Sequence, residues 1–414
     1  MTQAVHVIGA GLAGLSAAVM LAEGKATVIV HEAAGHGGGR CRSFYDDTLG
    51  CRIDNGNHLL LSGNRATLDY LKRIGAEGSL VGPDQAAFPF LDLRTKERWL
   101  VKPDAGVIPW SLFSAKTRVP GSSLGEYLRG LSLAWASSEK TISQCLMGRG
   151  ALYERFWEPL AVSVLNTEAD KASAKLLWPV LRETFGRGAV ACIPLIVRDG
   201  LSESFVDPAL AYLERSGNSA VFNHRLRAIH SSNDRISELD FGDEKITLGK
   251  NDRVVLAVPP SVAKSLLPDL LVPDDYRPIV NGHFIVPKKV EKTRFLGLVG
   301  GAAHWLFVRN ELASITVSAA NDLVLKSSED IANQLWSDIC IALELGDCPL
   351  GPYRIVKEKR ATFAQTPEQL LKRPDTKTKW QNLVVAGDWT DTGLPATIEG
   401  TIRSGMKAAK SIQE

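Results

Sequence analysis

Cysteine is scarce in this chain, and its spacing excludes several kinds of site. The six cysteines never form a Cys-x-x-Cys pair, and none combines with histidine at the spacing of a zinc site. We therefore expect no metal. Cysteines without a pairing pattern are typical of a reducing compartment, so we expect a cytoplasmic protein whose thiols are small apolar side chains.

An excess of one charge is also lacking. Lysine and arginine together number 48, and aspartate and glutamate 46, which gives a net charge of +2. No basic block interleaved with aromatic residues occurs, so we expect no nucleic-acid partner. With 414 residues and 45% hydrophobic side chains, the chain is long and apolar enough for two or three packed units.

Long uncharged runs are rare. Residues 5–21 contain no Asp, Glu, Lys or Arg, but three glycines interrupt them and no basic segment precedes them. A membrane-spanning helix needs about 20 apolar residues, and a signal peptide begins with a basic segment. We expect neither in this chain.

The opening of the chain follows the pattern of a βαβ dinucleotide-binding unit. A β-branched run at 5–8 leads into Gly-Ala-Gly-Leu-Ala-Gly at 9–14, which is followed by a helical segment over 15–22. A second strand is expected over 26–31. A glycine motif alone is a weak signal, but here the strand, the helix and the second strand are all in place.

Each glycine of this motif has a predicted role. Gly9 allows the tight turn, Gly11 lets a pyrophosphate approach the backbone, and Gly14 lets the helix pack closely on the strand. The amides of Leu12 and Ala13 then lie at the helix start, where free N–H groups and the helix dipole attract phosphate.

The second strand ends in an acid, and a second glycine-rich segment follows. Glu32 is placed to accept hydrogen bonds from ribose hydroxyls, and its charge disfavours a 2′-phosphate. In the segment 37–42, Gly39 lets the backbone pass close to a cofactor, and Arg40 is expected to face a phosphate or the flavin ring. A simple NAD dehydrogenase needs no such segment, and no second GxGxxG occurs. We therefore expect non-covalently bound FAD.

These three features together resemble the flavin-containing amine oxidase and phytoene desaturase superfamily. The resemblance implies an α/β plus α+β fold, in which a Rossmann-like FAD-binding domain is interleaved with a substrate-binding domain. The FAD-binding domain is expected over 1–85, 195–265 and 379–414. The substrate-binding domain is expected over 86–194 and 266–378.

The resemblance also implies where the chain returns to the FAD. We expect a helix over 205–213, a strand over 221–226 with a backbone contact at Leu226 near the adenine, and a buried strand over 254–260.

The last return is the most specific. A strand over 383–386 leads to Gly387 and Asp388, and Asp388 is implied to bind the ribityl–pyrophosphate region. The final helix is expected to start at Pro395, so that Thr397 and Ile398 face the flavin.

Longer segments resemble one family within this superfamily. Residues 40–44, 53–64, 157–160 and 386–400 are similar to the hydroxysqualene dehydroxylases of bacterial hopanoid biosynthesis. The resemblance implies reductive removal of a hydroxyl from hydroxysqualene to give squalene, with reduced FAD as the hydride source.

Such a reaction needs a proton donor near the flavin. His58 is the predicted donor, because imidazolium forms readily near neutral pH. Asp54 is a second candidate, and Gly56 and Asn57 between them are expected to contact the cofactor. Each has an alternative: His58 shapes the loop or binds flavin, and Asp54 only orients the backbone. Glu399 is a weaker candidate acid.

The implied partners are an apolar isoprenoid, a membrane surface and other enzymes of squalene biosynthesis. A C30 substrate needs a long apolar tunnel, and the substrate domain's aromatic residues are candidates for its walls. The apolar stretch 107–113 is expected to dip into the lipid interface, which would place the protein on the inner face of the plasma membrane.

Three alternative functions remain open. An amine oxidase would use the same frame but needs an aromatic cage at the flavin. A carotenoid or squalene desaturase would run the opposite electron flow. A non-catalytic lipid carrier would bind FAD without turnover.

Overall fold

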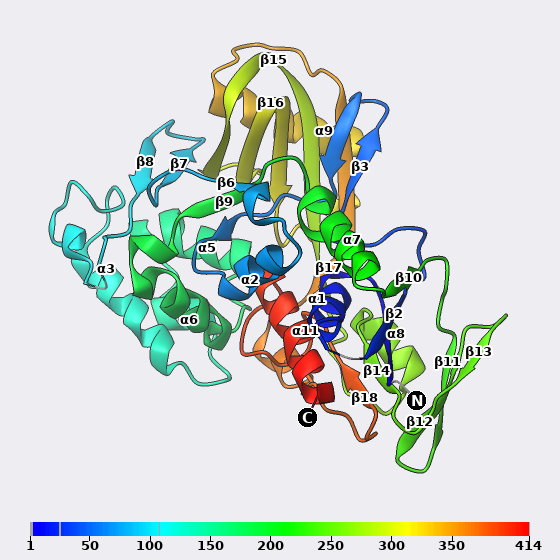
Figure 1. Ribbon diagram of the computed structural model, residues 1–414. Coiled ribbons are helices and arrows are strands. Elements are labelled where there is room, and N and C mark those ends of the chain that lie inside the picture. Colours follow the sequence, from blue (N-terminus) through cyan, green and yellow to red (C-terminus); the bar gives the residue numbers. More distant parts are fainter. Residues whose placement is uncertain (1–2, 25, 107, 414) are drawn as a thin grey trace.

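The computed structural model describes residues 3–24, 26–106 and 108–413 (Figure 1). Of the apolar stretch 107–113, Val107 lies outside the described residues. A parallel sheet and its helices form one end of the molecule, and a larger, mostly antiparallel sheet forms the other. A group of short helices lies beside the two sheets.

The parallel sheet carries the cofactor motifs. Its strands run in the order β10 (Ser219–Val221), β2 (Thr27–His31), β1 (Ala4–Ile8), β14 (Arg253–Leu256) and β18 (Leu383–Val385). All four pairings are parallel. Strands β2, β1, β14 and β18 are mostly buried, as the β-branched runs in the sequence predicted, whereas β10 at the edge of the sheet is largely exposed. They come from three distant parts of the chain, each inside a stretch expected for FAD binding.

Helices cover one face of this sheet. They are α1 (Leu12–Leu21), α2 (Arg65–Arg73), α7 (Asp207–Arg215) and α11 (Ile398–Gln413), which share one hydrophobic cluster. The approach of α1 to α11 requires a glycine, because a Cβ on Gly405 would lie 2.1 Å from the Ser16 hydroxyl. The helix α8 (Pro260–Leu266) and a small antiparallel sheet pack on the other face. That sheet consists of β11 (Ala228–Ser232), β12 (Arg235–Asp240) and β13 (Lys245–Thr247).

The second large sheet is antiparallel in most of its pairings. Its order is β16 (Trp305–Val317), β15 (Tyr276–Val299), β7 (Phe88–Asp92) and β8 (Arg98–Val101), and β17 (Tyr353–Phe363) also pairs with β15. Helix α9 (Ser328–Leu343) packs against it. Both stretches expected for substrate binding contribute strands to this sheet. The domain boundaries themselves stay a prediction.

Shorter elements complete the molecule. Four helices form a separate cluster: α3 (Leu124–Arg129), α4 (Ile142–Leu146), α5 (Glu158–Leu165) and α6 (Ala174–Glu183). Two small sheets join the large ones, namely β3 (Ser43–Asp46) with β4 (Cys51–Asp54), and β5 (Leu60–Leu61) with β9 (Pro194–Val197) and β6 (Leu80–Val81). The short helix α10 (Pro367–Leu370) precedes β18. No helix within the described ranges is both long and apolar enough to cross a bilayer.

Several predicted elements need correction. The strand expected over 221–226 ends at Val221, because Asn223 takes a positive φ of 56° and the amide of His224 bonds to the carbonyl of Glu32. The strand expected over 254–260 ends at Leu256, and Pro260 begins a helix.

Two predicted helices also differ from their expected bounds. The helix expected over 205–213 starts with a π-helical turn at Ser202–Val206 before α7. The last helix begins at Ile398 rather than at Pro395. The hydroxyl of Thr397 accepts from the Gly400 amide, which is the pattern of an N-cap.

Candidate active site

Of the three glycines in the motif at 9–14, one borders space that no protein atom fills. Gly9 has a φ of +107°, and a Cβ on Gly14 would lie 1.9 Å from the carbonyl oxygen of Gly9, so the protein's own packing requires both glycines. A Cβ on Gly11 would meet nothing within 4 Å. The backbone therefore does not need a glycine there. A pyrophosphate resting on Gly11 accounts for it, and the cradle fits a dinucleotide.

The start of α1 faces the same space. Gly11 is its N-cap, no side chain caps it, and its first turn holds no acid. The amides of Leu12 and Ala13 belong to the first turn, where an α-helix supplies no acceptor. The second glycine segment lies directly beside this turn, because Gly38 forms a bridge with Gly11 and its amide bonds to the Ala10 carbonyl at 2.7 Å.

Glu32 lies at the end of β2, as predicted. One carboxylate oxygen accepts from the amide of Ala10 at 2.7 Å and the other from the amide of Ala34 at 2.8 Å. These bonds fix the carboxylate beside the glycine turn, and each oxygen keeps a lone pair for a hydroxyl donor. Leu226 is buried against the small antiparallel sheet. Its predicted contact with adenine stays a prediction.

Arg40 and Asp388 join the first and last cofactor segments. Two guanidinium nitrogens of Arg40 contact the two oxygens of Asp388, at 2.8 and 2.9 Å. The carboxylate raises the pKa of Arg40, and Arg40 also bonds to the carbonyl of Ala361. The Arg40 side chain remains 43% exposed, whereas that of Asp388 is 7% exposed. Arg40 therefore holds Asp388 in place while keeping donors on the open side.

Gly387 occupies a position that only glycine fills easily. Its φ is +155°, and a Cβ there would lie 2.3 Å from the indole nitrogen of Trp389. Its amide donates to the hydroxyl of Ser404 on α11. The Gly387–Asp388 pair is thus fixed against the final helix, whose start holds Thr397 and Ile398.

The segment 54–58 lies between the two large sheets and is tied to β15 and β16 by an amide network. Asn57 donates to the Thr316 hydroxyl, which donates to the side-chain oxygen of Asn281 at 2.8 Å. Asn281 in turn donates to the carbonyl of Asn55 at 3.1 Å. Asn281 also closes over Gly56, where a Cβ would lie 3.2 Å from its amide nitrogen. The network fixes this turn, which explains why a small residue stands at 56.

Asp54 is fully engaged in structural bonds. One oxygen accepts from the hydroxyl of Ser43 and the amide of Leu201, and the other from Arg309 at 3.0 Å. Both carboxylate oxygens are therefore occupied by protein donors, one of which is the Arg309 guanidinium. The geometry favours the orienting role of Asp54 over that of an acid.

Glu399 is likewise a structural residue. Its carboxylate accepts from the amides of Ala66 and Thr67, from the Thr67 hydroxyl and from Arg403. It therefore caps the start of α2 rather than serving as the proton donor.

His58 differs from both acids. No hydrogen bond within the described part of the chain involves its ring, and it lines a small cavity of about 20 Å³. The other lining residues are Asp54, Asn57, Ile196, Val197, Phe307 and Arg309. Burial lowers the pKa of His58; the charge of Asp54 raises it, and that of Arg40 lowers it, with a net decrease. The ring is therefore neutral near neutral pH, which argues against the predicted imidazolium.

The sequence candidates for the tunnel walls, Phe88, Phe90, Trp110, Leu112, Phe113, Trp157, Trp178, Trp305 and Phe307, lie in three places, and Trp157 and Trp178 pack in the helical cluster. Phe88, Phe90, Trp305 and Phe307 share a buried cluster with Ile196 and Cys192 beside the His58 cavity. Trp110 and Phe113 are instead 68% and 65% exposed, and therefore do not line a tunnel. The 20 Å³ cavity holds about one water molecule, so a C30 chain requires the aromatic side chains of this cluster to move.

Sequence reasoning missed the residues that β15 and β16 contribute. Arg309, Asn281 and Thr316 lie outside the segments that resemble the family, and no motif marks them. Arg309 also donates to the carbonyls of Arg198 and Asp199, which links the small sheets to β16. Asn281 and Thr316 are register partners and share a face, but Arg309, seven residues before Thr316, would lie on the opposite face by strict alternation, so alternation does not bring the three together.

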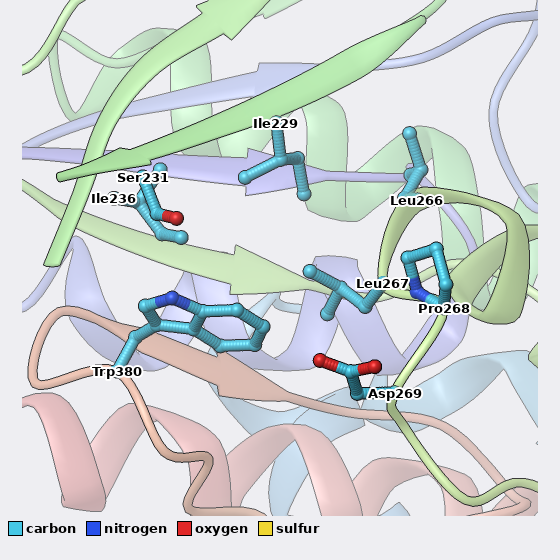
Figure 2. A pocket seen from close by; sticks show the side chains of 8 residues that line it. All are labelled: Ile229, Ser231, Ile236, Leu266, Leu267, Pro268, Asp269 and Trp380. Carbon is cyan, nitrogen blue, oxygen red and sulfur yellow. The ribbon is translucent and has the colours of Figure 1, made fainter. Parts of the chain in front are cut away.

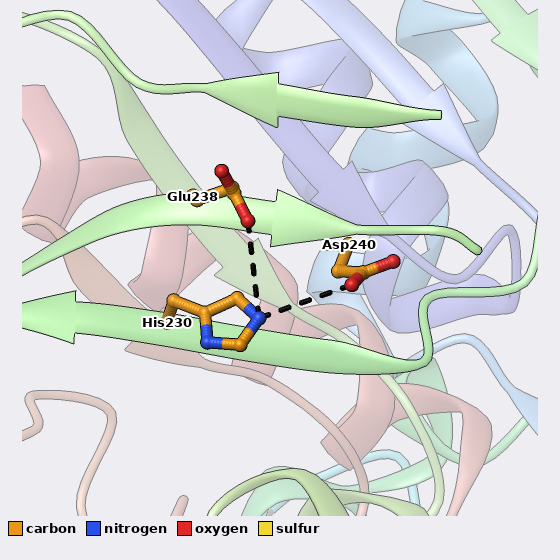
Figure 3. Close-up of side chains that lie close together, drawn as sticks. All are labelled: His230, Glu238 and Asp240. Carbon is orange, nitrogen blue, oxygen red and sulfur yellow. Dashed lines mark ion pairs between the residues drawn. The ribbon is translucent and has the colours of Figure 1, made fainter. Parts of the chain in front are cut away.

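Two features lie outside this site. A cavity of about 180 Å³ opens beside Trp380, between β11, β12 and α8 (Figure 2). On the small antiparallel sheet, His230 lies 3.8 and 3.9 Å from carboxylate oxygens of Glu238 and Asp240 (Figure 3). Their arrangement satisfies the spacing of a metal site, which the sequence did not predict. The Lys245 ammonium contacts both carboxylates at 3.3 and 3.1 Å, so a cross-strand ion-pair network accounts for the group.

The fold is shared with solved flavoenzymes. A putrescine oxidase with bound putrescine superposes with a TM-score of 0.69 at 15% identity, covering 100% of this chain and 99% of that one. Cyclohexylamine oxidase from Brevibacterium oxydans gives 0.67 at 16% identity with the same coverage. The predicted fold class is therefore confirmed.

The sequence has much closer relatives. The profile of the family described as flavin containing amine oxidoreductase matches residues 12–413. Hydroxysqualene dehydroxylase from Rhodopseudomonas palustris is 48% identical over 99% of this chain and 98% of its own length, and that from Sinorhizobium fredii is 45% identical with equal coverage. A 15-cis-phytoene desaturase from Synechococcus elongatus is only 22% identical. The chain is a flavin-dependent oxidoreductase and belongs to the hydroxysqualene dehydroxylase family.

Proposed function

We propose that this protein binds FAD non-covalently and uses it, in reduced form, to replace the hydroxyl of hydroxysqualene by hydrogen. The open space over Gly11 carries the cofactor part of the proposal, because no contact within the protein requires a glycine there. Identity of 48% to a named hydroxysqualene dehydroxylase over nearly the full chain supports the substrate.

FAD rather than a smaller flavin is favoured by the extent of the cradle. The proposed site begins at Gly11, Leu12, Ala13 and Glu32 and continues to Arg40 and Asp388. This extent suits a dinucleotide. A flavin mononucleotide has neither the second phosphate nor the ribose that Glu32 is placed to bind. Non-covalent attachment is favoured because burial raises the pKa of the nearby Cys41 thiol well above its ordinary value, which keeps it from acting as a nucleophile.

The reaction breaks a C–O bond and forms a C–H bond. Fully reduced FAD would supply a hydride to the carbon and one proton to the departing hydroxyl, which then leaves as water. We propose that neutral His58 donates a hydrogen bond to the hydroxyl oxygen, since its ring faces the cavity without a protein partner. The contact between Asp54 and Arg309 holds the backbone near His58.

The apolar surroundings complete the site. Ile196, Val197 and Phe307 exclude water around His58, so that a proton is not lost to solvent and the hydroxyl does not return to a developing cation. We further propose that the protein works as a peripheral protein on the inner face of the plasma membrane, beside other enzymes of squalene biosynthesis, because its substrate is an apolar isoprenoid.

A substrate panel tests this function. The flavin released by denaturation should be FAD, with none left on the polypeptide. Reduced enzyme should convert hydroxysqualene, whereas oxidised enzyme should leave phytoene, squalene and putrescine unchanged. Oxidation of phytoene, squalene or putrescine would replace dehydroxylation by one of the alternative functions.

A further inference from the structure

Large apolar side chains are exposed on one side of the helical cluster. They come from the 3-10 helix η2 (Trp110–Phe113) with Ile108 two residues before it, from α3, and from the 3-10 helix η3 (Gly130–Trp135). η2 packs against α3, and α3 against η3. In Figure 1 α3 lies at the edge of the molecule, far from the parallel sheet. This apolar face consists of Ile108, Trp110, Phe113, Leu128, Leu131 and Trp135, all at least half exposed.

The exposure does not come from a poorly packed segment. Leu133 of η3 is buried in the helical cluster, and Gly130 packs against the ring of Trp157, while Leu131 and Trp135 on the same short helix point outward. The start of α3 is fixed by a capping box between Ser123 and Glu126. The exposed side chains are therefore presented by an ordered scaffold of neighbouring elements, and large apolar side chains exposed together in this way mark an interaction site.

The stretch of chain that carries this face is mostly basic. Residues 101–150 contain six lysines and arginines but three acids. Two of these acids are used internally, since Asp104 bonds to Ser111 and Glu126 to Ser123. Four exposed cations, Lys102, Lys116, Lys140 and Arg149, have no ion-pair partner among the residues that the structure describes. Tryptophan and phenylalanine flanked by free cations fit an anionic lipid surface.

Residues 189–197 run from a position beside the apolar face to the His58 cavity. The amide of Ala189 bonds to the carbonyl of Asp104 at 2.7 Å, just before the apolar face begins. Val190, the next residue, is 72% exposed. From there the chain runs into β9, whose Ile196 and Val197 line the cavity with His58. The aromatic cluster of Phe88 and Phe307 packs along this stretch.

We infer that this apolar face docks on an anionic membrane and that the isoprenoid enters from the bilayer along the aromatic cluster to His58. The inference rests on the proposed function for its substrate, but not for its docking surface. It extends the expectation for 107–113 to a second segment, α3 and η3, which the sequence did not single out.

Vesicle binding of the FAD-loaded protein tests the docking surface. The double variant Trp110→Glu with Trp135→Glu changes one residue in each segment. Leu325→Glu with Leu371→Glu is the matched control, because these leucines are 82% and 75% exposed but lie outside the face. On vesicles of phosphatidylglycerol and phosphatidylcholine, the first variant should bind at least about tenfold more weakly than wild type, and the control should bind equally. Equal binding of both variants would overturn the docking surface.

The entry route is tested with hydroxysqualene supplied in two forms. In detergent micelles, the face variant should turn over like wild type. With hydroxysqualene embedded in anionic vesicles, it should be at least about tenfold slower. Equal rates from vesicles would overturn entry through this face. Absence of turnover by wild type in detergent would instead overturn the proposed function, while the vesicle-binding result would stand by itself.

Discussion

The guanidinium of Arg40 and the carboxylate of Asp388 form a two-point contact across 348 residues of sequence. It joins the segment after the first βαβ unit to the segment before the last helix. Both segments face the space in which we propose that FAD lies. The contact therefore orients the Asp388 carboxylate beside that space.

Replacing Arg40 by lysine should therefore weaken cofactor binding even though the positive charge is kept. Arg40→Lys keeps the charge but cannot contact both oxygens in the same way. We expect at least a tenfold weaker FAD affinity and a loss of about 1–3 kcal/mol in unfolding free energy, since Asp388 is left buried and partly unpaired. Titration of apoprotein with FAD and chemical denaturation measure both. Wild-type affinity in Arg40→Lys would show that the two-point contact is not needed.

Gly11→Val should abolish FAD binding and leave the fold intact. The side chain enters open space in the protein alone, and collides only with the proposed pyrophosphate. Gly14→Val is the matched variant, because its Cβ would lie 1.9 Å from the Gly9 carbonyl and should disrupt the fold itself. Circular dichroism and the flavin-to-protein ratio distinguish the two. Full flavin occupancy in Gly11→Val would place the phosphates elsewhere.

Acid should destabilise the protein through its buried histidines. Burial lowers the pKa of His31 to about 3, with further lowering by His6 and His224, and burial lowers the pKa of His283 and His304 to about 4. The unfolded chain binds protons on these rings below about pH 6.5 and the folded protein does not. Stability is therefore complete above that pH and falls as the pH drops toward 4.

The size of this effect is measurable by urea denaturation. At about pH 5 each of these rings should lower the free energy of unfolding by on the order of 1–2 kcal/mol relative to about pH 7.5. His304→Gln should reduce the difference in unfolding free energy between the two pH values by the contribution of one ring. An unchanged stability between the two pH values would show that these rings are protonated in the folded protein.

The sequence predicts the cofactor half of the site better than the half around His58. The cofactor motifs are local in the chain, so Gly9, Gly14 and Glu32 could be placed from spacing alone. The side chains around His58 come from strands paired over long distances, as Asn55 with Asn281 and Asp54 with Arg309. No local pattern encodes such pairings, and therefore Arg309 was missed and Asp54 was given a catalytic role that its bonds do not favour.

Turns account for the errors in element bounds. A single residue with positive φ, Asn223, ends the stretch 221–226 that was expected as a strand. Similarly, Pro395 is compatible with a helix start, but the hydroxyl of Thr397 supplies the cap two residues later. Composition predicts that a strand or helix lies nearby, whereas hydrogen bonds of single side chains set where it stops.

His58→Ala should keep its FAD and lose about 10²-fold or more in single-turnover reduction of hydroxysqualene. A neutral donor predicts a rate that is nearly constant between about pH 6.5 and 8.5, because the lowered pKa lies below this range. His58→Gln, whose amide can also donate, should recover part of the rate. A rate that instead rises steadily as the pH falls, and no recovery with glutamine, would restore imidazolium as the acid.

Dehydroxylation itself is tested most directly by one anaerobic turnover in heavy water. The FAD-loaded protein is reduced with dithionite in D2O and mixed with hydroxysqualene, and the lipid is extracted for mass spectrometry. Because the transferable hydrogen of reduced flavin exchanges with solvent, we predict squalene with one carbon-bound deuterium and one oxidised flavin for each squalene formed. Unchanged hydroxysqualene beside flavin that stays reduced would contradict the proposed reaction.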